Sequence, residues 1–451
     1  MKQHACSSAY RIRPRLRALT FFLFSLTLAI AWPAGALGQT PLRNGDNHPG
    51  SISVMGEVDE WSLSAAQGNH LTVSIGEIFE GELDPGFYPR IRLLRPDGVQ
   101  VGTDSDYLAA QVTVTAPLSG TYVVRVDDNS GQDRTGSYLL RLAQTPGEFM
   151  VPAGDEGGAM TNGANHPGKI TLGDVDLWSI VARQGDSLTV SIGEVFEGEV
   201  DPGFYPRIRL LRPDGVQVGA DSDYLAAQVT VTAPLSGTYV VLVDDNSGQD
   251  RTGSYVLHLA VAPERFVVSA GDQGGLLSIG SPNAGFLHLG DLDLWYLRTH
   301  AGETVSIRVR DTSDGGKLYP QIRIHRPDGS LVESRSGPEQ AEITFRPADS
   351  CLHTIVVSDT TDAVGSYELT TVGLREQAKQ VSVRKLANSV LKICWPSDLV
   401  GHVLQQNEAL QVEGWKDVEV STTDSGLNVE ALVPTESGMN RFFRLRPPAA
   451  P

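Results

Sequence analysis

Hydrophobic and polar residues alternate one by one over many short stretches of this chain. Leu71, Val73 and Ile75 are separated by polar residues. The same period of two recurs in three later runs, 112–114, 122–126 and 138–142. This period is typical of half-buried β-strands, and turn residues such as the Pro-Asp-Gly at 96–98 stand between the runs. About eight short strands in ~100 residues, with no helical period, predict an all-β, jelly-roll-like β-sandwich.

The chain repeats itself with a period of 117 residues. Trp61, Trp178 and Trp295 mark the same position in three copies. Residues 67–143 align with 184–260 without a gap and differ at eight of 77 positions, so identity between these copies does not single out functional residues. The third copy has diverged more. A fixed period of this kind indicates tandem modules built on one fold.

Prolines mark the expected boundaries between the modules. Pro146 and Pro263 precede two similar glycine-rich segments that begin at Phe149 and Phe266. The predicted domains are a signal peptide (1–38), three β-sandwiches (39–146, 147–263 and 264–375) and a small C-terminal β-domain (376–451). The last domain has strand-like runs at 390–395, 403–405, 415–420, 428–433 and 441–445. At ~70 residues it is marginal in size for an independent core.

The N-terminus has the order of features found in secretory signal peptides. A basic lead precedes an apolar run at 18–32, which is short for a membrane span of ~20 residues, and small residues precede Gln39. An uncleaved N-terminal anchor is the alternative interpretation. No later run is long and apolar enough to predict a transmembrane segment. We therefore expect an exported protein, in the medium, on the cell surface or in the periplasm.

The net charge of the chain excludes some classes of binding partner, and its cysteines leave the question of a disulfide open. The chain has 54 acidic and 36 basic residues and a formal net charge of -18. This balance argues against nucleic acid and anionic membranes, both of which favour Lys and Arg. The expected partner is an extracellular polymer or protein. Cys351 and Cys394 remain after the signal peptide, and a disulfide between them and two free thiols are both open.

The motifs, taken in order, resemble the bacterial pre-peptidase C-terminal domain family. They are Gly-Asp-x-Asp-x-Trp (290–295), the Pro-Asp-Gly turn (96–98), Ser-Gly-Thr-Tyr (119–122) and Gly-Ser-Tyr (365–367), recurring over about 40–373. The C-terminal segments 394–396, 414–415 and 441–445 are similar to small fibronectin-III-like tails of exported bacterial proteins. The resemblance implies jelly-roll-like sandwiches that accompany secreted enzymes, often peptidases, without doing chemistry. Relatives in bacterial collagenases bind matrix protein and are stabilised by calcium.

No motif for catalysis is visible in the sequence. The histidines are scattered singly, without the spacing of a metalloprotease helix, and there is no Gly-x-Ser-x-Gly turn or phosphate-binding glycine loop. Cys351 and Cys394 have no obvious neighbouring base. We therefore expect no catalytic residues and no enzyme, although a triad assembled from distant residues is the alternative.

Acidic residues cluster where the modules join and suggest calcium, which prefers six to eight oxygen ligands. The candidate ligands are Asp155, Glu156, Asp174, Asp176, Asp272, Asp291 and Asp293. In the calcium-binding relatives the ion lies between the incoming linker and the tryptophan strand, so the resemblance implies the same placement here. The alternative is that each central aspartate only hydrogen-bonds a loop beside the buried tryptophan. No cofactor other than this ion is expected.

Aromatic residues in a Gly/Pro-rich loop suggest a contact surface in the first two modules. The candidates are Phe79, Phe87, Tyr88, Phe196, Phe204 and Tyr205. Aromatic residues are enriched at interface hot spots, but they also plug the open ends of sandwiches. A second acidic run, 127–133, fits a polar hairpin loop better than an EF-type site, because its closing glutamate is missing. The arginines at 90, 92, 95, 207, 209 and 212 are expected to pair with acids on a solvated face.

These features together favour a non-catalytic binding protein. Near-identical modules in tandem suggest multivalent contact, in which linked sites raise the apparent affinity. The expected function is adhesion to an extracellular polymer or protein, with calcium as a stabilising ion. The alternative is an accessory subunit of a separately encoded secreted hydrolase.

Overall fold

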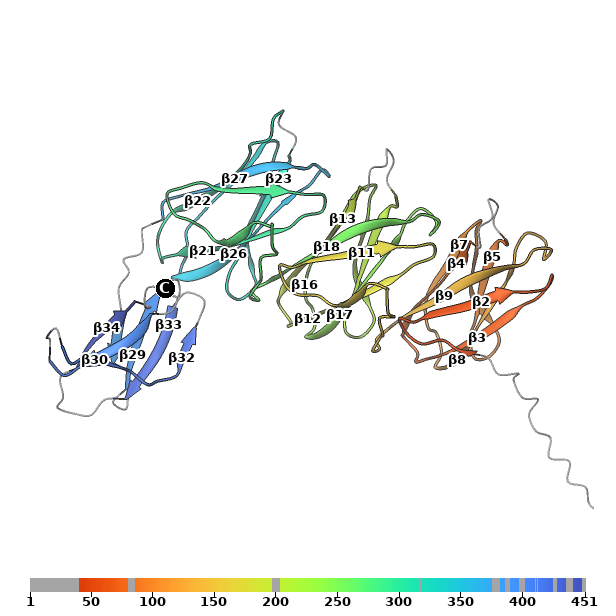
Figure 1. Cartoon of the computed structure of the whole chain (residues 1–451), viewed down its shortest axis with the longest axis horizontal. Helices are drawn as coiled ribbons and strands as arrows, with labels where there is room; N and C mark the ends of the chain where they lie inside the picture. Colours follow the sequence, from red (N-terminus) through yellow and green to blue (C-terminus); the bar gives the residue numbers. More distant parts are fainter. Residues whose placement is uncertain are drawn as a thin grey trace, which may run out of the picture. The chain divides into compact units, whose positions relative to one another are not determined.

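The computed structural model describes four long segments and several short ones. The long segments are 40–79, 86–196, 203–315 and 318–374, and the short ones are 382–385, 390–396, 402–409, 411, 413–424, 428–434 and 441–447. They all belong to one unit that spans Thr40–Pro451. In this part of the chain every regular element is a strand, so the all-β prediction is confirmed (Figure 1). The predicted signal peptide, 1–38, lies outside the described residues. The described part holds no helix that could cross a membrane.

The first module is a sandwich of two sheets. Its strands are β1 (Thr40–Pro41), β2 (Asn47–Ile52), β3 (Asp59–Ala65), β4 (His70–Ile78), β5 (Pro89–Leu94), β6 (Gln100–Ser105), β7 (Ala109–Thr115), β8 (Gly120–Asp128) and β9 (Gly136–Thr145). One sheet has the order β1-β3-β8-β5-β6 and the other β2-β9-β4-β7. β1 pairs with β3 in parallel, and the other pairs are antiparallel. The alternating sequence forms strands as predicted, and β5 has one buried face. In β4 the prediction of a half-buried strand is wrong, because Thr72 and Ser74 are fully buried as well.

The second and third modules repeat this topology strand for strand. The second has β10 (Gly157–Ala159), β11 (Asn165–Ile170), β12 (Asp176–Ala182), β13 (Ser187–Val195), β14 (Pro206–Leu211), β15 (Gln217–Ser222), β16 (Ala226–Thr232), β17 (Gly237–Asp245) and β18 (Gly253–Ala262). The third has β19 (Gly274–Leu276), β20 (Asn283–Leu287), β21 (Asp293–Thr299), β22 (Val305–Asp311), β23 (Pro320–His325), β24 (Leu331–Ser336), β25 (Gln340–Phe345), β26 (Cys351–Asp359) and β27 (Gly365–Val372). β9 and β18 end one residue before Pro146 and Pro263, the prolines that mark the expected boundaries.

The C-terminal segments form two smaller sheets. Their strands are β28 (Ser382–Lys385), β29 (Val390–Pro396), β30 (Val403–Asn407), β31 (Lys416–Asp417), β32 (Thr422–Asp424), β33 (Asn428–Pro434) and β34 (Phe442–Arg446). The orders are β28-β29-β33-β32 and β31-β30-β34. Of the run at 415–420, only Lys416–Asp417 is a strand. Ile393, Trp395 and Val433 are buried in a small core of this domain.

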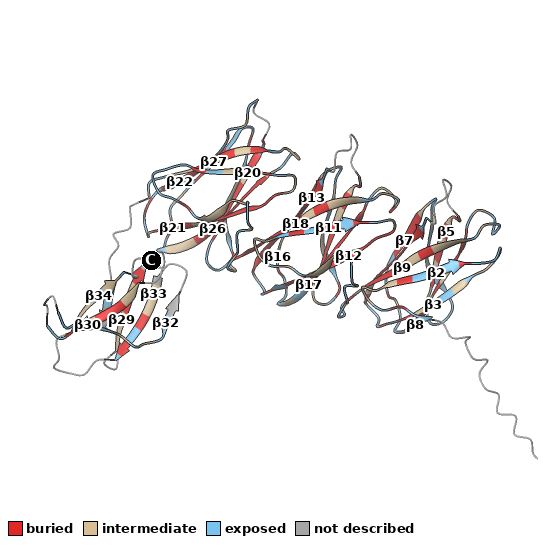
Figure 2. Ribbon diagram, in the orientation of Figure 1, coloured by how far each residue is buried: buried red, intermediate tan, exposed pale blue. Residues whose placement is uncertain are grey.

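Each large module has its own core between the two sheets (Figure 2). The tryptophans at 61, 178 and 295 lie at most 8% exposed in these cores. In each module the indole N–H donates to a buried tyrosine hydroxyl: Trp61 to Tyr138 (2.9 Å), Trp178 to Tyr255 (3.0 Å) and Trp295 to Tyr367 (2.9 Å). The hydroxyl in turn donates to the aspartate that begins the tryptophan strand, at 2.7, 2.5 and 2.6 Å. The indole N–H and the tyrosine hydroxyl of each chain are thus paired in the core, which favours this one arrangement of the buried side chains.

Neighbouring modules contact each other through side chains of successive copies. Arg209 in β14 donates from Nη1 to Thr72 and Thr113 of the first module, at 3.3 and 3.2 Å. Arg323 in β23 makes the same contacts with Thr189 and Thr230 of the second module, at 3.1 and 2.5 Å. Arg209 is 6% exposed, so the expectation of a solvated face is wrong at this position. The modules bury these arginines where they meet.

Candidate metal centre

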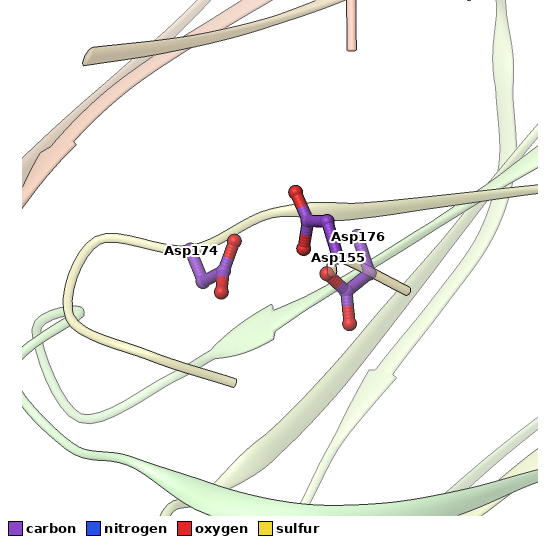
Figure 3. A group of neighbouring side chains, drawn as sticks. All are labelled: Asp155, Asp174 and Asp176. Carbon is purple, nitrogen blue, oxygen red and sulfur yellow. The ribbon is translucent and has the colours of Figure 1, made fainter. Parts of the chain in front are cut away.

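The predicted carboxylates of the second module come together at the start of β12. Asp176 is the first residue of this strand, and Asp174 precedes it by two residues. Asp155 lies in the linker that leads into β10. The parallel pairing places Gly157 beside Leu177, which brings Asp155 next to the other two. One carboxylate oxygen from each residue lies within 4.8 Å of the others (Figure 3). Residues about 20 positions apart in the sequence therefore form one acidic group.

The third module repeats the group with the same register. β19 pairs in parallel with β21, with Gly274 beside Leu294. Asp272 precedes β19, and Asp291 and Asp293 lie at the start of β21. Their carboxylate oxygens are again within 4.8 Å of one another. Six of the seven predicted ligands are thus gathered in two equivalent groups.

Glu156 does not belong to the first group, although it lies beside it. Burial raises the pKa of its carboxyl group, and the charges of Asp155 and Asp174 raise it further. Ionisation of Glu156 is therefore disfavoured beside the group. The structure assigns it no ligand position among the described residues.

Burial makes these carboxylates costly to ionise. Asp176 is 2% exposed and Asp293 is fully buried. Burial raises the pKa of Asp176 well above its usual range, and the charge of Asp174 adds to the rise. The pKa of Asp293 is raised to about 9, first by burial and then by the charge of Asp291. Carboxyl groups with such pKa values need protons or a bound cation.

One oxygen of each buried aspartate has no hydrogen-bond partner. Oδ2 of Asp176 accepts from Tyr255, whereas Oδ1 has no partner. Asp293 shows the same asymmetry, with Oδ2 bonded to Tyr367 and Oδ1 unpaired. A buried oxygen without a partner is rare, because leaving it unsatisfied costs about 1–3 kcal/mol. Hydrogen bonding beside the tryptophan is therefore part of the role of these residues and leaves one oxygen of each available to an ion.

The first module lacks an equivalent group among the described residues. Asp59 keeps the hydrogen bond from Tyr138, but the preceding acid is Glu57, whose carboxylate accepts from the backbone N–H groups of Ser53 and Val54. The position equivalent to Asp155 is Gly38, outside the described residues. Asp59 therefore accepts the tyrosine hydrogen bond without belonging to a three-carboxylate group.

The two groups differ in the cationic residue beside them. Arg141 of the first module lies 3.0 Å from Asp174. Its counterpart is His258, whose Nδ1 lies 3.4 Å from Asp291 and whose pKa burial lowers to about 4. His258 is therefore neutral at pH 7. The acidic group of the third module thus lacks the positive charge that Arg141 brings to the group of the second module. Arg141 and His258 are among the eight differences between the first two modules, a signal in the sequence that only the contact makes meaningful.

The aromatic prediction is corrected by burial. Phe87 and Phe204 are fully buried, with their rings 6.0 and 6.3 Å from those of Tyr138 and Tyr255, so they are core residues and not contact residues. Phe79 is 46% exposed, as is Phe196 in the second module. The rest of their loop, 80–85 and 197–202, lies outside the described residues.

Tyr88 and Tyr205 belong to a surface cluster that the sequence pattern did not reveal. The ring of Tyr88 lies 4.9 Å from that of Tyr107, and the guanidinium of Arg134 lies 4.8 Å from the Tyr88 ring. Tyr205, Tyr224 and Arg251 repeat this arrangement at 5.0 and 4.6 Å. Tyr107 and Tyr224 are 45% and 47% exposed. We call each set of two tyrosines and one arginine the tyrosine–arginine cluster.

The acidic run at 127–133 is used internally. Asp127 pairs with Arg90 at 2.8 Å and with Arg92 at 2.6 Å. The carboxylate of Asp128 accepts from the backbone N–H groups of Tyr88, Ser130 and Asp133. These bonds match the hairpin interpretation.

Among the described residues, neither Cys351 nor Cys394 is part of a disulfide. Cys351 does have a base nearby, since its Sγ lies 3.6 Å from Nδ1 of His353, two residues along β26 on the same face. Burial raises the pKa of the Cys351 thiol and lowers that of His353 to about 4. A neutral thiol beside a weakly basic imidazole is the opposite of an activated nucleophile.

Titration of the buried aspartates should make stability depend on pH when a chelator is present. The pKa of Asp293 is raised in the folded state, so its contribution to stability is complete below the unfolded value of 3.8 and is lost as pH rises through about 9. We expect the melting temperature in EDTA to fall between pH 5 and pH 9, as measured by calorimetry. Asp293→Asn should flatten this fall. A melting temperature that rises over the same range contradicts the assignment.

Comparison with known proteins supplies only distant likenesses. No family model and no curated protein matches the chain. One similar solved structure is the pre-peptidase C-terminal domain of a collagenase from Bacillus anthracis, at 15% identity and a TM-score of 0.20, covering 22% of this chain and 95% of that domain. A triple jelly roll protein from the turret of an archaeal virus has 9% identity and a TM-score of 0.17, with 73% and 88% covered. The M60 catalytic domain with two CBM51 domains of Clostridium perfringens ZmpB has 10% identity and a TM-score of 0.15, with 69% and 33% covered. Scores this low carry no argument about function, which is inferred below from the chain's own residues.

Proposed function

We propose that this chain is an exported, non-catalytic adhesion protein. It consists of three modules of the pre-peptidase C-terminal type, with boundaries at 146, 263 and 375, and a fibronectin-III-like domain at 376–451. It contacts an extracellular polymer or protein multivalently and is stabilised by calcium. The observation that carries the proposal is the repeated carboxylate group, which ties each incoming linker to the module that follows it.

Calcium fits these groups by its chemistry. Three carboxylates within 4.8 Å, one with an unpaired buried oxygen, offer hard oxygen ligands to a divalent cation. Asp155 and Asp272 come from the linkers, whereas the other ligands come from β12, β21 and the residues just before them. A bound ion would therefore hold linker and strand together. Because His258 is neutral where Arg141 is charged, the group of the third module is the tighter site.

In this proposal the ligand contacts exposed aromatic residues of the first two modules, which we call the aromatic set. It comprises Phe79 with the tyrosine–arginine cluster of the first module, and Phe196 with that of the second. Aromatic rings and arginine are the side chains most enriched at binding hot spots. Two identical surfaces on one chain provide avidity.

Binding should fall steeply when one of these surfaces is altered. The mature chain would be tested on immobilised collagens, peptidoglycan and polysaccharides, in calcium and in EDTA. On any matrix that retains it, Tyr107→Ala with Phe79→Ser should lower retention by about 10-fold or more, since hot-spot residues contribute at least about 2 kcal/mol and avidity is lost. Altering the second module as well should abolish retention. The control is Val181→Ser, which removes an apolar side chain that is 77% exposed but lies outside the aromatic set.

The outcomes separate the candidate functions. Loss of retention in EDTA supports calcium-dependent adhesion, and retention that ignores EDTA keeps adhesion without the ion. No retention on any matrix contradicts adhesion. Co-purification of a secreted hydrolase would then support the accessory-subunit alternative, and turnover of a peptide or glycan by the purified chain would contradict the non-catalytic assignment.

A further inference from the structure

The junction between the first and second modules buries an arginine together with its counter-ion. Arg209 is 6% exposed and donates from Nη2 to Oδ2 of Asp244 at 2.5 Å. Asp244 is fully buried and also accepts from Arg207 and from Gln111 of the first module, at 2.8 and 3.0 Å. The guanidinium charge is thus met by a carboxylate within the same module.

The next junction keeps the arginine and loses the carboxylate. Arg323 is 5% exposed and occupies the position of Arg209, with its Nη1 on Thr189 and Thr230. Ser358 stands where Asp244 stands, because it pairs with Gln321 in the register in which Asp244 pairs with Arg207. The side chain of Ser358 is fully buried. A serine is shorter than an aspartate by most of a carboxylate group.

Two polar groups are left unpaired at this position. Neither Nη2 of Arg323 nor Oγ of Ser358 has a hydrogen-bond partner. Nε is unpaired in Arg209 as well as in Arg323, so it does not distinguish the junctions. The difference lies in Nη2, which donates to the Asp244 carboxylate in Arg209 and has no partner in Arg323.

A guanidinium buried without a counter-charge is strongly unfavourable. Burial alone lowers the pKa of Arg323 to about 10, and no carboxylate contributes to that shift. The group therefore stays charged at neutral pH. The neighbouring cavity of about 240 Å³ is lined by five aspartates, Asp291 among them, and by neither Arg323 nor Ser358, so these two donors lie outside it.

We infer that the junction between the second and third modules binds one small monovalent anion, chloride or a small carboxylate, between Nη2 of Arg323 and Oγ of Ser358. Both groups donate hydrogen bonds, and the anion takes the place that the Asp244 carboxylate fills in the preceding junction. One uncompensated guanidinium calls for a single negative charge. The inference does not use the calcium proposal, although Asp291 of the acidic group in the third module lines the neighbouring cavity.

Chloride-dependent stability of the whole mature chain tests the inference. Thermal unfolding is followed by calorimetry in chloride, bromide, formate or gluconate at one ionic strength and one calcium concentration. We expect the transition of the third module to rise by about 5 °C in saturating chloride relative to gluconate, a bulky anion that the site excludes. Formate giving the larger shift would identify a carboxylate as the preferred anion.

Two reciprocal variants make the assignment specific. Ser358→Asp restores the carboxylate found in the second module, so it should unfold at a higher temperature and lose the anion effect. Asp244→Ser should create a second anion-dependent transition. A bromide-soaked crystal should show anomalous scattering beside Arg323 in the unmodified chain and none in Ser358→Asp. The inference is overturned if the unmodified chain responds equally to all four anions, if Ser358→Asp keeps the full chloride response, or if no bromide peak lies at Arg323.

Discussion

Saturating calcium is expected to raise the melting temperature of the chelator-treated protein by about 10–20 °C. A ligand present at about 100 times its dissociation constant stabilises the folded state by ~2.7 kcal/mol, and ~1 kcal/mol corresponds to about 4–8 °C for a domain of this size. The effect should be confined to the second and third modules, because among the described residues only they contain the three-carboxylate group. Calorimetry with EDTA and with added calcium measures it.

Matched aspartate variants distinguish metal binding from hydrogen bonding. Asp293→Asn keeps an oxygen that can accept from Tyr367 but removes the charge, so it should abolish the calcium effect in the third module. Asp59→Asn makes the same change in the first module and should leave the calcium response unaltered. His258→Arg should weaken calcium binding in the third module, because it introduces the positive charge that Arg141 brings to the other group. An equal calcium response in the unmodified chain and in Asp293→Asn would refute the site.

Replacing Gly193 with valine is expected to uncouple the third module from the second while leaving both folded. A Cβ atom at Gly193 would lie 1.8 Å from the backbone oxygen of Leu289, across the junction. A contact this short forces the segment around Leu289 to move. Asp291 lies two residues further along the same segment. The contacts of Arg323 with Thr189 and Thr230 should be lost with it. Limited proteolysis between 263 and 274 should then become about 10-fold faster, because cleavage follows the population of the open junction.

The third module supplies the control for this substitution. Its residue equivalent to Gly193 is Arg310, which pairs with Glu368 at 3.2 Å. Arg310→Val should leave proteolysis of the 263–274 segment unchanged. If Gly193→Val also leaves that rate unchanged, the junction is not held by this backbone approach. Circular dichroism and the retained calcium response of the second module would show that the module itself is folded.

The equivalent faces of the three modules are not chemically alike. The first two present Gly76 and Gly193, with Ser74 and Ser191 beside them in β4 and β13. The third presents Arg308 at the serine position, paired with Glu342 at 2.7 Å. Long charged side chains here replace the small residues that let a following module approach closely. At these two positions the third copy differs from the first two, whose Gly76 and Gly193 face the backbone of the following module.

The sequence by itself determined the strands, the repeat and the identity of the acidic residues. Alternation with a period of two is a local property of the sequence. Residues such as Leu71, Val73 and Ile75 therefore predict a strand, and the side chains that face its core, without knowledge of the fold. The 117-residue period likewise predicts that whatever surrounds Trp178 also surrounds Trp295. Six of the seven candidate calcium ligands could be chosen because the acids recur at fixed offsets from these tryptophans.

Only the tertiary structure decided which of these residues meet. Asp155 joins Asp174 and Asp176 because β10 pairs in parallel with β12, a long-range pairing that no local pattern encodes. Phe79 and Phe87 lie in one loop sequence, yet one is half exposed and the other is in the core, since burial depends on what packs above them. The same holds for Arg209, which has the same sequence neighbours as Arg92 and is nevertheless more deeply buried, because the first module covers it. Local periodicity specifies elements, whereas charge, burial and ligand geometry arise from contacts between residues distant in the chain.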